Sequence, residues 1–140
     1  MAKKRGQASM EYLLVVGFAL IMLMPLVVIH MTQEESIRDD SNLMQATNIV
    51  QTLTSNAESI HFIGEPSRTT IEVRMPQNIK DIRIEENDWN RIVFEVMTGG
   101  GVVEVYKYTD VKLTGSLEPS QGLTRILIEA EDGRVKISQK

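Results

Sequence analysis

A dense group of charged and polar residues stands at the amino end of the chain, directly before a long apolar segment. A basic tripeptide comes first and Gly6 follows it, and the order is Lys3-Lys4-Arg5-Gly6-Gln7-Ala8-Ser9-Met10-Glu11-Tyr12. The chemistry that this order suits is peptide cleavage, because a cut after Gly6 removes three cations and leaves the apolar segment on the mature protein. Ordinary secretory signals carry their small residues after the apolar segment. None occurs in 30–35, so we expect processing between Gly6 and Gln7.

The apolar segment is long enough to cross a membrane as a helix. From Tyr12 to Gln33 there are 22 consecutive residues without formal charge, and a helix of that length reaches about 33 Å. Cations precede the segment, and carboxylates follow it closely, at Glu34, Glu35, Asp39 and Asp40. This asymmetry predicts a cytoplasmic amino end, with everything after Gln33 outside the membrane.

The head of the sequence resembles the class III signal peptide of archaeal type IV pilin-like proteins. The resemblance covers roughly the first 30 residues, and its motif is Gly6 before the cut, then Gln-x-Ser-x-Glu-Tyr. It implies that a prepilin peptidase recognises the basic head and the motif residues, which are Lys3, Lys4, Arg5, Gln7, Ser9, Glu11 and Tyr12. It also implies a membrane-anchored precursor that the pilus assembly machinery packs into an extracellular surface filament, a helical homopolymer for adhesion.

Glu11 is the one carboxylate at the start of the apolar segment, where an unpaired charge is costly in free energy. The resemblance implies that Glu11 serves assembly with Gln7, whose new α-ammonium it would meet in its own or a neighbouring subunit. An amino-terminal glutamine can also cyclise to uncharged pyroglutamate, and Glu11 would then need donors such as Ser9 or Tyr12 of an adjacent helix. In the simplest alternative Glu11 only lies at the membrane surface, where the dipole at the amino end of the helix stabilises its negative charge.

The helical pattern continues beyond the apolar segment. A narrow apolar stripe has spacings of 3, 4, 3, 4 and 3, at Leu43, Ala46, Val50, Leu53, Ala57 and Ile60. We therefore expect one helix from about Ser9 to about Phe62, stopped by Gly64 and Pro66. The stripe would pack on the domain that follows or, alternatively, form a short coiled coil. Gly17 and Pro25 interrupt the apolar part, and the missing donor of Pro25 predicts a helix kink.

From Ser67 onward the pattern alternates between apolar and polar residues, which is typical of strands. Six strands are expected, at 69–75, 81–85, 91–97, 102–108, 123–130 and 134–138, with turns at 98–101 and at Asp132-Gly133. One long helix followed by a compact antiparallel β domain, sandwich-like or a curled sheet, makes the fold class α+β. The expected divisions are 1–6, a signal peptide; 7–33, a hydrophobic membrane and filament-core helix; 34–63, its amphipathic continuation; and 67–140, a β-rich domain.

Composition and motifs argue against several classes of function. Loss of Lys3, Lys4 and Arg5 from 15 cations leaves 12 against 19 anions, a net charge of −7 instead of −4, which disfavours nucleic acid as a partner. The chain has no cysteine, and its two histidines, His30 and His61, lie too far apart on one helix to share a site. We therefore expect no enzyme activity, no cofactor and no metal site.

Two further patterns have ordinary structural explanations. The acidic segment 85–88 lacks the ligand spacing of a calcium loop, so a solvated turn is expected there. Trp89, Tyr106 and Tyr108 are the most conspicuous aromatics, and aromatic residues in strands usually pack in the core or across strands. A sugar- or surface-binding patch is the alternative for these three residues. The leading hypothesis for the whole chain is a structural pilin subunit; the alternative is a minor pilin or a monomeric, membrane-anchored extracellular binding module.

Overall fold

The computed structural model describes the backbone of residues 3–86 and 89–140, and the side chains of these residues except 3–8 and 32–35. The chain forms two compact units, Met1–Arg38 and Asp39–Lys140. One helix, α1 (Lys3–Ile63), runs through the first unit and into the second, and strands make up most of the remainder. The predicted α+β class, with one long amino-terminal helix ahead of the β structure, is confirmed.

In the first unit, α1 is an unbroken helix. It starts at Lys3, earlier than the expected start near Ser9, because lysine, arginine and glutamine are good helix formers and a single glycine is tolerated. The helix continues past Gly17 and has Pro25 in its interior. Of the helices that the structure describes, α1 is long and apolar enough to cross a membrane, and its most apolar stretch has no buried residue.

The second unit contains two sheets. Within residues 39–86 and 89–140, the strands are β1 (Arg68–Met75), β2 (Ile79–Glu85), β3 (Asn90–Thr98), β4 (Gly101–Thr109), β5 (Leu113–Ser116), β6 (Gly122–Glu131) and β7 (Arg134–Gln139). The first sheet has the order β1-β6-β7-β5, and the second has the order β2-β3-β4. All six predicted strands are present, with ends that differ by at most two residues.

The β5 strand was not predicted, and it changes the sheet type. It pairs parallel to β7, with Leu113 opposite Val135 and Gly115 opposite Ile137. The other strand pairs that the structure describes are antiparallel, as expected, and the β5–β7 edge is a parallel exception. Four residues that include a glycine are too short a segment to display the alternation by which strands are recognised.

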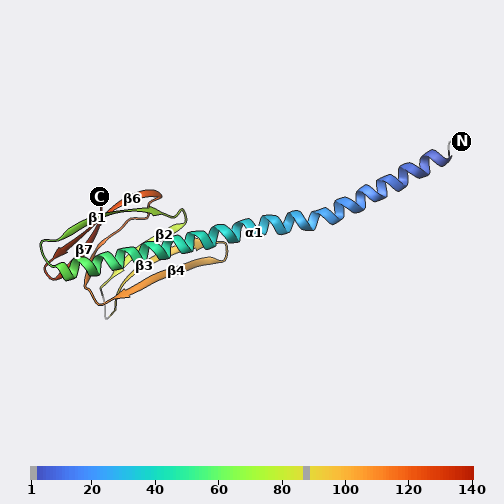
Figure 1. The fold of residues 1–140 in the computed structure, drawn as a ribbon. Coiled ribbons are helices and arrows are strands. Elements are labelled where there is room, and N and C mark those ends of the chain that lie inside the picture. Colours follow the sequence, from blue (N-terminus) through green and yellow to red (C-terminus); the bar gives the residue numbers. More distant parts are fainter. Residues whose placement is uncertain (1–2, 87–88) are drawn as a thin grey trace. The chain divides into compact units, whose positions relative to one another are not determined.

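The core of the second unit lies between α1 and both sheets. The predicted stripe on α1 is buried from Ala46 to Ile60, with Ile49 added to it and Leu43 partly buried. Figure 1 shows this part of α1 beside the strands of both sheets. The stripe packs against Val73, Met75, Ile126, Ile128, Val135 and Ile137 of the first sheet and against Ile82, Ile92, Phe94 and Val96 of the second. The prediction that the stripe packs on the β domain is confirmed.

The ends of the elements follow the predicted stop and turn residues. Gly64 has a φ of 82°, and its N–H donates to the Ile60 carbonyl at 3.1 Å, which is the usual glycine cap of a helix carboxyl end. Asp132 and Gly133 have φ values of 51° and 70°, as a two-residue type I′ hairpin requires. The β3–β4 turn is tied to α1 in the second unit, because the Gly99 N–H donates to the Asp39 carboxylate at 2.7 Å.

Candidate functional site

The predicted processing residues lie on the first turns of α1. Lys3 through Gln7 have helical backbone, while the side chains of Lys3, Lys4, Arg5 and Gln7 are outside the described set. Met1 and Ala2, which belong to the predicted 1–6 segment, lie outside the described residues altogether. Gln7 and Glu11 are four residues apart on one helix and therefore share one face.

The remaining motif residues are in contact with solvent. Ser9, Glu11 and Tyr12 are all exposed. Within the part of the chain that the structure describes, the Glu11 carboxylate has neither a hydrogen bond nor an ion pair.

The apolar part of α1 exposes large side chains on every side. Between Met10 and Met31 the exposed residues include Leu13, Leu14, Phe18, Ile21, Met24 and Val28, and their positions go all round a helix of 3.6 residues per turn. A helix that is apolar all round must be buried in lipid or among other apolar helices. By length and composition, this segment could anchor in a membrane.

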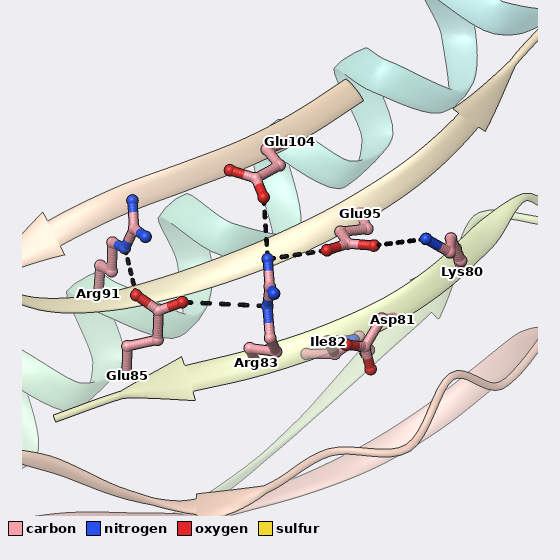
Figure 2. A network of polar contacts seen from close by, with 8 residues as sticks. All are labelled: Lys80, Asp81, Ile82, Arg83, Glu85, Arg91, Glu95 and Glu104. Atoms are coloured by element: carbon pink, nitrogen blue, oxygen red, sulfur yellow. Dashed lines mark hydrogen bonds and ion pairs between the residues drawn. The ribbon is translucent and has the colours of Figure 1, made fainter. Parts of the chain in front are cut away.

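A second distinctive surface is the face of the β2-β3-β4 sheet that points away from α1. Because Ile92, Phe94 and Val96 join the core, the intervening β3 residues lie on the opposite face. Figure 2 shows a network of ion pairs on this face. Arg83 Nη2 lies 2.8 Å from Glu95 and 2.9 Å from Glu104, and Lys80 Nζ lies 3.2 Å from Glu95.

The same network continues to the pair Glu85 and Arg91, which are cross-strand partners. Arg91 Nε lies 2.6 Å from Glu85 Oε2. The hydrogen bond from Arg91 lowers the pKa of Glu85 below its ordinary value of 4.5, and the charge of Arg83 adds to this effect. The bond to Glu85 correspondingly raises the pKa of Arg91. Arg91 is therefore held in place as a fixed cation.

Three aromatic residues stand beside Arg91 on this face. Trp89 is 73% exposed, and Tyr106 and Tyr108 are each 48% exposed. The rings meet edge to face, with centroids 6.0 Å apart for Trp89 and Tyr108 and 5.3 Å apart for the two tyrosines. The Arg91 guanidinium lies 5.5 Å from the Tyr106 ring centroid. These aromatics therefore pack against one another on the solvent side. Of the expected packing in the core or across strands, the core placement is wrong, while Trp89, directly before β3, does contact Tyr108 of β4. The alternative of a binding patch stays a prediction.

The aromatic group borders a hollow of about 500 Å³. Its lining residues are Trp89, Asn90, Tyr108, Thr109 and Asp110. Thr109 is buried, and its hydroxyl donates to Glu58 at 3.0 Å and accepts the Val111 N–H at 3.3 Å. The sequence indicated Trp89 and Tyr108 as part of an alternative surface patch but not Asn90, Thr109 and Asp110. Since β4 carries apolar residues on both faces, alternation alone cannot tell which of its faces is exposed. The outward set Val102, Glu104, Tyr106 and Tyr108 is identified only by the register of β4 with β3, because each face of β4 carries one charged residue.

The other residues that the sequence analysis considered for a catalytic or metal site, where described, are exposed or paired with arginine. His30 and His61 are both exposed on α1. In the acidic segment, Glu85 pairs with Arg91, and Glu86 pairs with Arg134 at 3.1 Å, while Asn87 and Asp88 lie outside the described residues. Among the residues that are described, no three His, Asp or Glu side chains are grouped to hold a metal ion.

Comparison of the chain with protein-family models, with curated proteins and with solved structures finds no match.

Proposed function

We propose that this chain is the structural subunit of an archaeal type IV pilus-like surface filament. The precursor is anchored in the cell membrane by the apolar part of α1 and is cut after Gly6 by a prepilin peptidase. The assembly machinery then packs mature copies into a helical homopolymer. The apolar helices form the fibre core, the second units remain in water, and the filament serves adhesion at the cell surface.

One observation supports this proposal most strongly. The apolar part of α1 is exposed on all sides, and the same helix continues into the second unit, where it forms part of the core. Such a helix needs an apolar environment whether it lies in lipid or among its own copies. Assembly exchanges one environment for the other, so the change in apolar burial is small. The Gly6-Gln7-x-Ser9-x-Glu11-Tyr12 motif at its start supports the same function.

The filament proposal is tested on surface fibres from cells that express the chain. Electron microscopy should show fibres, and mass spectrometry of the purified fibres should find this chain as their main subunit. Its intact mass should correspond to a start at Gln7, either as free glutamine or with the small mass loss of pyroglutamate. Fibres whose subunit still carries residues 1–6, or a chain cut beyond His30, contradict the processing step.

The second candidate function is a minor pilin or a monomeric anchored module that binds a ligand outside the membrane. The observation that favours it is the open hollow at Trp89 and Tyr108 in the second unit. The two candidates differ in stoichiometry. A chain that stays in the membrane fraction after processing, and that is absent from fibres or rare in them, supports the module and contradicts the main-subunit proposal.

A further inference from the structure

We propose that the hollow lined by Trp89 and Tyr108 binds a neutral saccharide. The proposal concerns a ligand site in the second unit, and it stands whether or not the chain forms a filament. It depends on three features of the described residues: an exposed aromatic platform, free polar groups at its edge, and the absence of an available cation among the residues that line the hollow.

The aromatic platform is exposed, and its rings contact one another and Arg91. Trp89 presents most of its ring to solvent and meets the edge of Tyr108, which in turn contacts Tyr106. Arg91 lies against Tyr106 and is held by Glu85 at 2.6 Å. An exposed ring face is apolar with a partial negative potential, which suits the C–H face of a pyranose.

The polar groups at the edge of the platform are those that a sugar needs. Asn90 offers one amide donor group and one acceptor, and Asp110 offers a carboxylate acceptor. Neither side chain makes a hydrogen bond or ion pair with another residue in the described part of the chain. Thr109, by contrast, already uses its hydroxyl for Glu58 and Val111. Sugar hydroxyls can donate to the Asp110 carboxylate, which lies in the lining with the Trp89 and Tyr108 rings. Asn90 alternates with Trp89 and shares the strand face of Ile92, so it serves as a secondary polar group of the lining.

Charge and size favour a neutral saccharide over other ligands. Among the described residues, the lining contains the Asp110 carboxylate and no Lys or Arg, and the neighbouring Arg91 forms an ion pair with Glu85. Phosphate, sulfated sugars and single-stranded nucleic acid all require available cations beside the stacking rings. A volume of about 500 Å³ lies in the range of small-ligand sites, whereas a protein partner typically covers about 800 Å² of each surface.

The test uses the full chain purified in lauryldimethylamine oxide, a detergent without a sugar head group. Trp89 is the only tryptophan, so intrinsic fluorescence reports directly on the platform. The probes are neutral tetrasaccharides of glucose, mannose, galactose and N-acetylglucosamine. At least one is expected to change the Trp89 emission saturably, with a dissociation constant of about 1 mM or below, and to protect Trp89 from acrylamide quenching.

Variants then locate the binding. Tyr108→Ala and Asp110→Ala should each weaken binding of that tetrasaccharide about tenfold or more, while circular dichroism stays unchanged because both side chains are exposed. Leu123→Ala removes a similarly exposed side chain from the other sheet and should bind like the wild type. No saturable binding of any of the four probes overturns the proposal. Equal binding by the wild type, Tyr108→Ala and Asp110→Ala also overturns it. Fibre assembly plays no part in these measurements, so their failure is separate from failure of the filament proposal.

Discussion

Glu95 and Glu104 are direct cross-strand partners on β3 and β4, and one guanidinium holds both carboxylates. Two like charges in this position repel each other. Arg83 offsets the repulsion because its Nη2 lies 2.8 Å from Glu95 and 2.9 Å from Glu104. Arg83 is itself the partner of Val93 on β2 and β3, and Val93 is fully buried although it points away from α1. The ion pairs therefore also form a cover over an apolar residue.

Replacement of Arg83 by methionine should destabilise the second unit. Arg83→Met keeps the long apolar stem above Val93 but leaves Glu95 and Glu104 facing each other. We expect a loss of about 1–2 kcal/mol, larger at low salt, because two partly exposed ion pairs are removed. Thermal unfolding followed by Trp89 fluorescence measures it. The same substitution made in a Glu104→Gln background should cost clearly less, and an equal cost in both backgrounds contradicts the bridging role of Arg83.

Much of the fold follows from local pattern in the sequence. The stripe from Leu43 to Ile60 and the strand alternations each repeat over many residues, so their periods are unambiguous. The stop at Gly64 and the Asp132-Gly133 hairpin follow from backbone conformations that few other residues adopt easily. The β5 strand depends instead on a long-range pairing with β7, and a segment of four residues carries no periodic sign of it.

The candidate sites also differ in whether their residues are adjacent in the sequence or are brought together by strand pairing. The predicted processing motif is contiguous, so it can be recognised from the sequence alone. The hollow combines Trp89 and Asn90 at the start of β3 with Tyr108, Thr109 and Asp110 at the end of β4. Only the β3–β4 register, with Asn90 opposite Thr109, brings these residues together. Likewise, the spacing of these residues in the sequence does not predict that Arg83 on β2 contacts both Glu95 on β3 and Glu104 on β4.

Acid should weaken the second unit in part through Glu85. The pKa of Glu85 is lower in the folded protein than its ordinary value of 4.5, so the unfolded chain takes up the proton more readily. The stabilisation is complete above pH 4.5 and is lost as the pH falls through the folded pKa. A Glu85→Gln variant should therefore show a flatter decline of Tm below pH 4.5 than the wild type. Glu131→Gln, which removes a longer and exposed pair with Lys136 at 3.6 Å, is the matched control and should follow the wild-type curve closely.

Gly115 should tolerate no larger residue. A Cβ at this position would lie 1.9 Å from the Ile137 carbonyl oxygen, and the φ of 117° is unfavourable for other residues. Gly115→Ala should cost about 3 kcal/mol or more, because backbone strain and overpacking add at the β5–β7 pair. Gly100→Ala is the control, since its Cβ would meet nothing closer than Thr98 Oγ1 at 3.9 Å. Comparable Tm values for the two variants would contradict the close approach of β5 and β7.

A fragment that begins at Asp39 should fold, whereas one that begins at Ser67 should not. The shorter fragment lacks six core side chains of α1, which are Ala46, Ile49, Val50, Leu53, Ala57 and Ile60, and loses the apolar burial that joins both sheets. Circular dichroism and size-exclusion chromatography should find the Asp39–Lys140 fragment folded and monomeric. A folded Ser67–Lys140 fragment would mean that the sheets are stable without the helix.

Glu11 should be needed for assembly and dispensable for processing. In the filament proposal, Glu11 enters an apolar helix bundle, where an unpaired carboxylate costs several kcal/mol and a paired one approaches neutrality. Its partner is the Gln7 ammonium, or donors of an adjacent helix where that glutamine has cyclised. Glu11→Ala should therefore be exported and cut after Gly6, yet give few or no fibres by electron microscopy. Glu34→Ala, which removes the next carboxylate along the chain, should assemble normally. If cleaved Glu11→Ala protein forms fibres in wild-type numbers, Glu11 only marks the membrane surface, where the helix dipole favours a carboxylate without any partner.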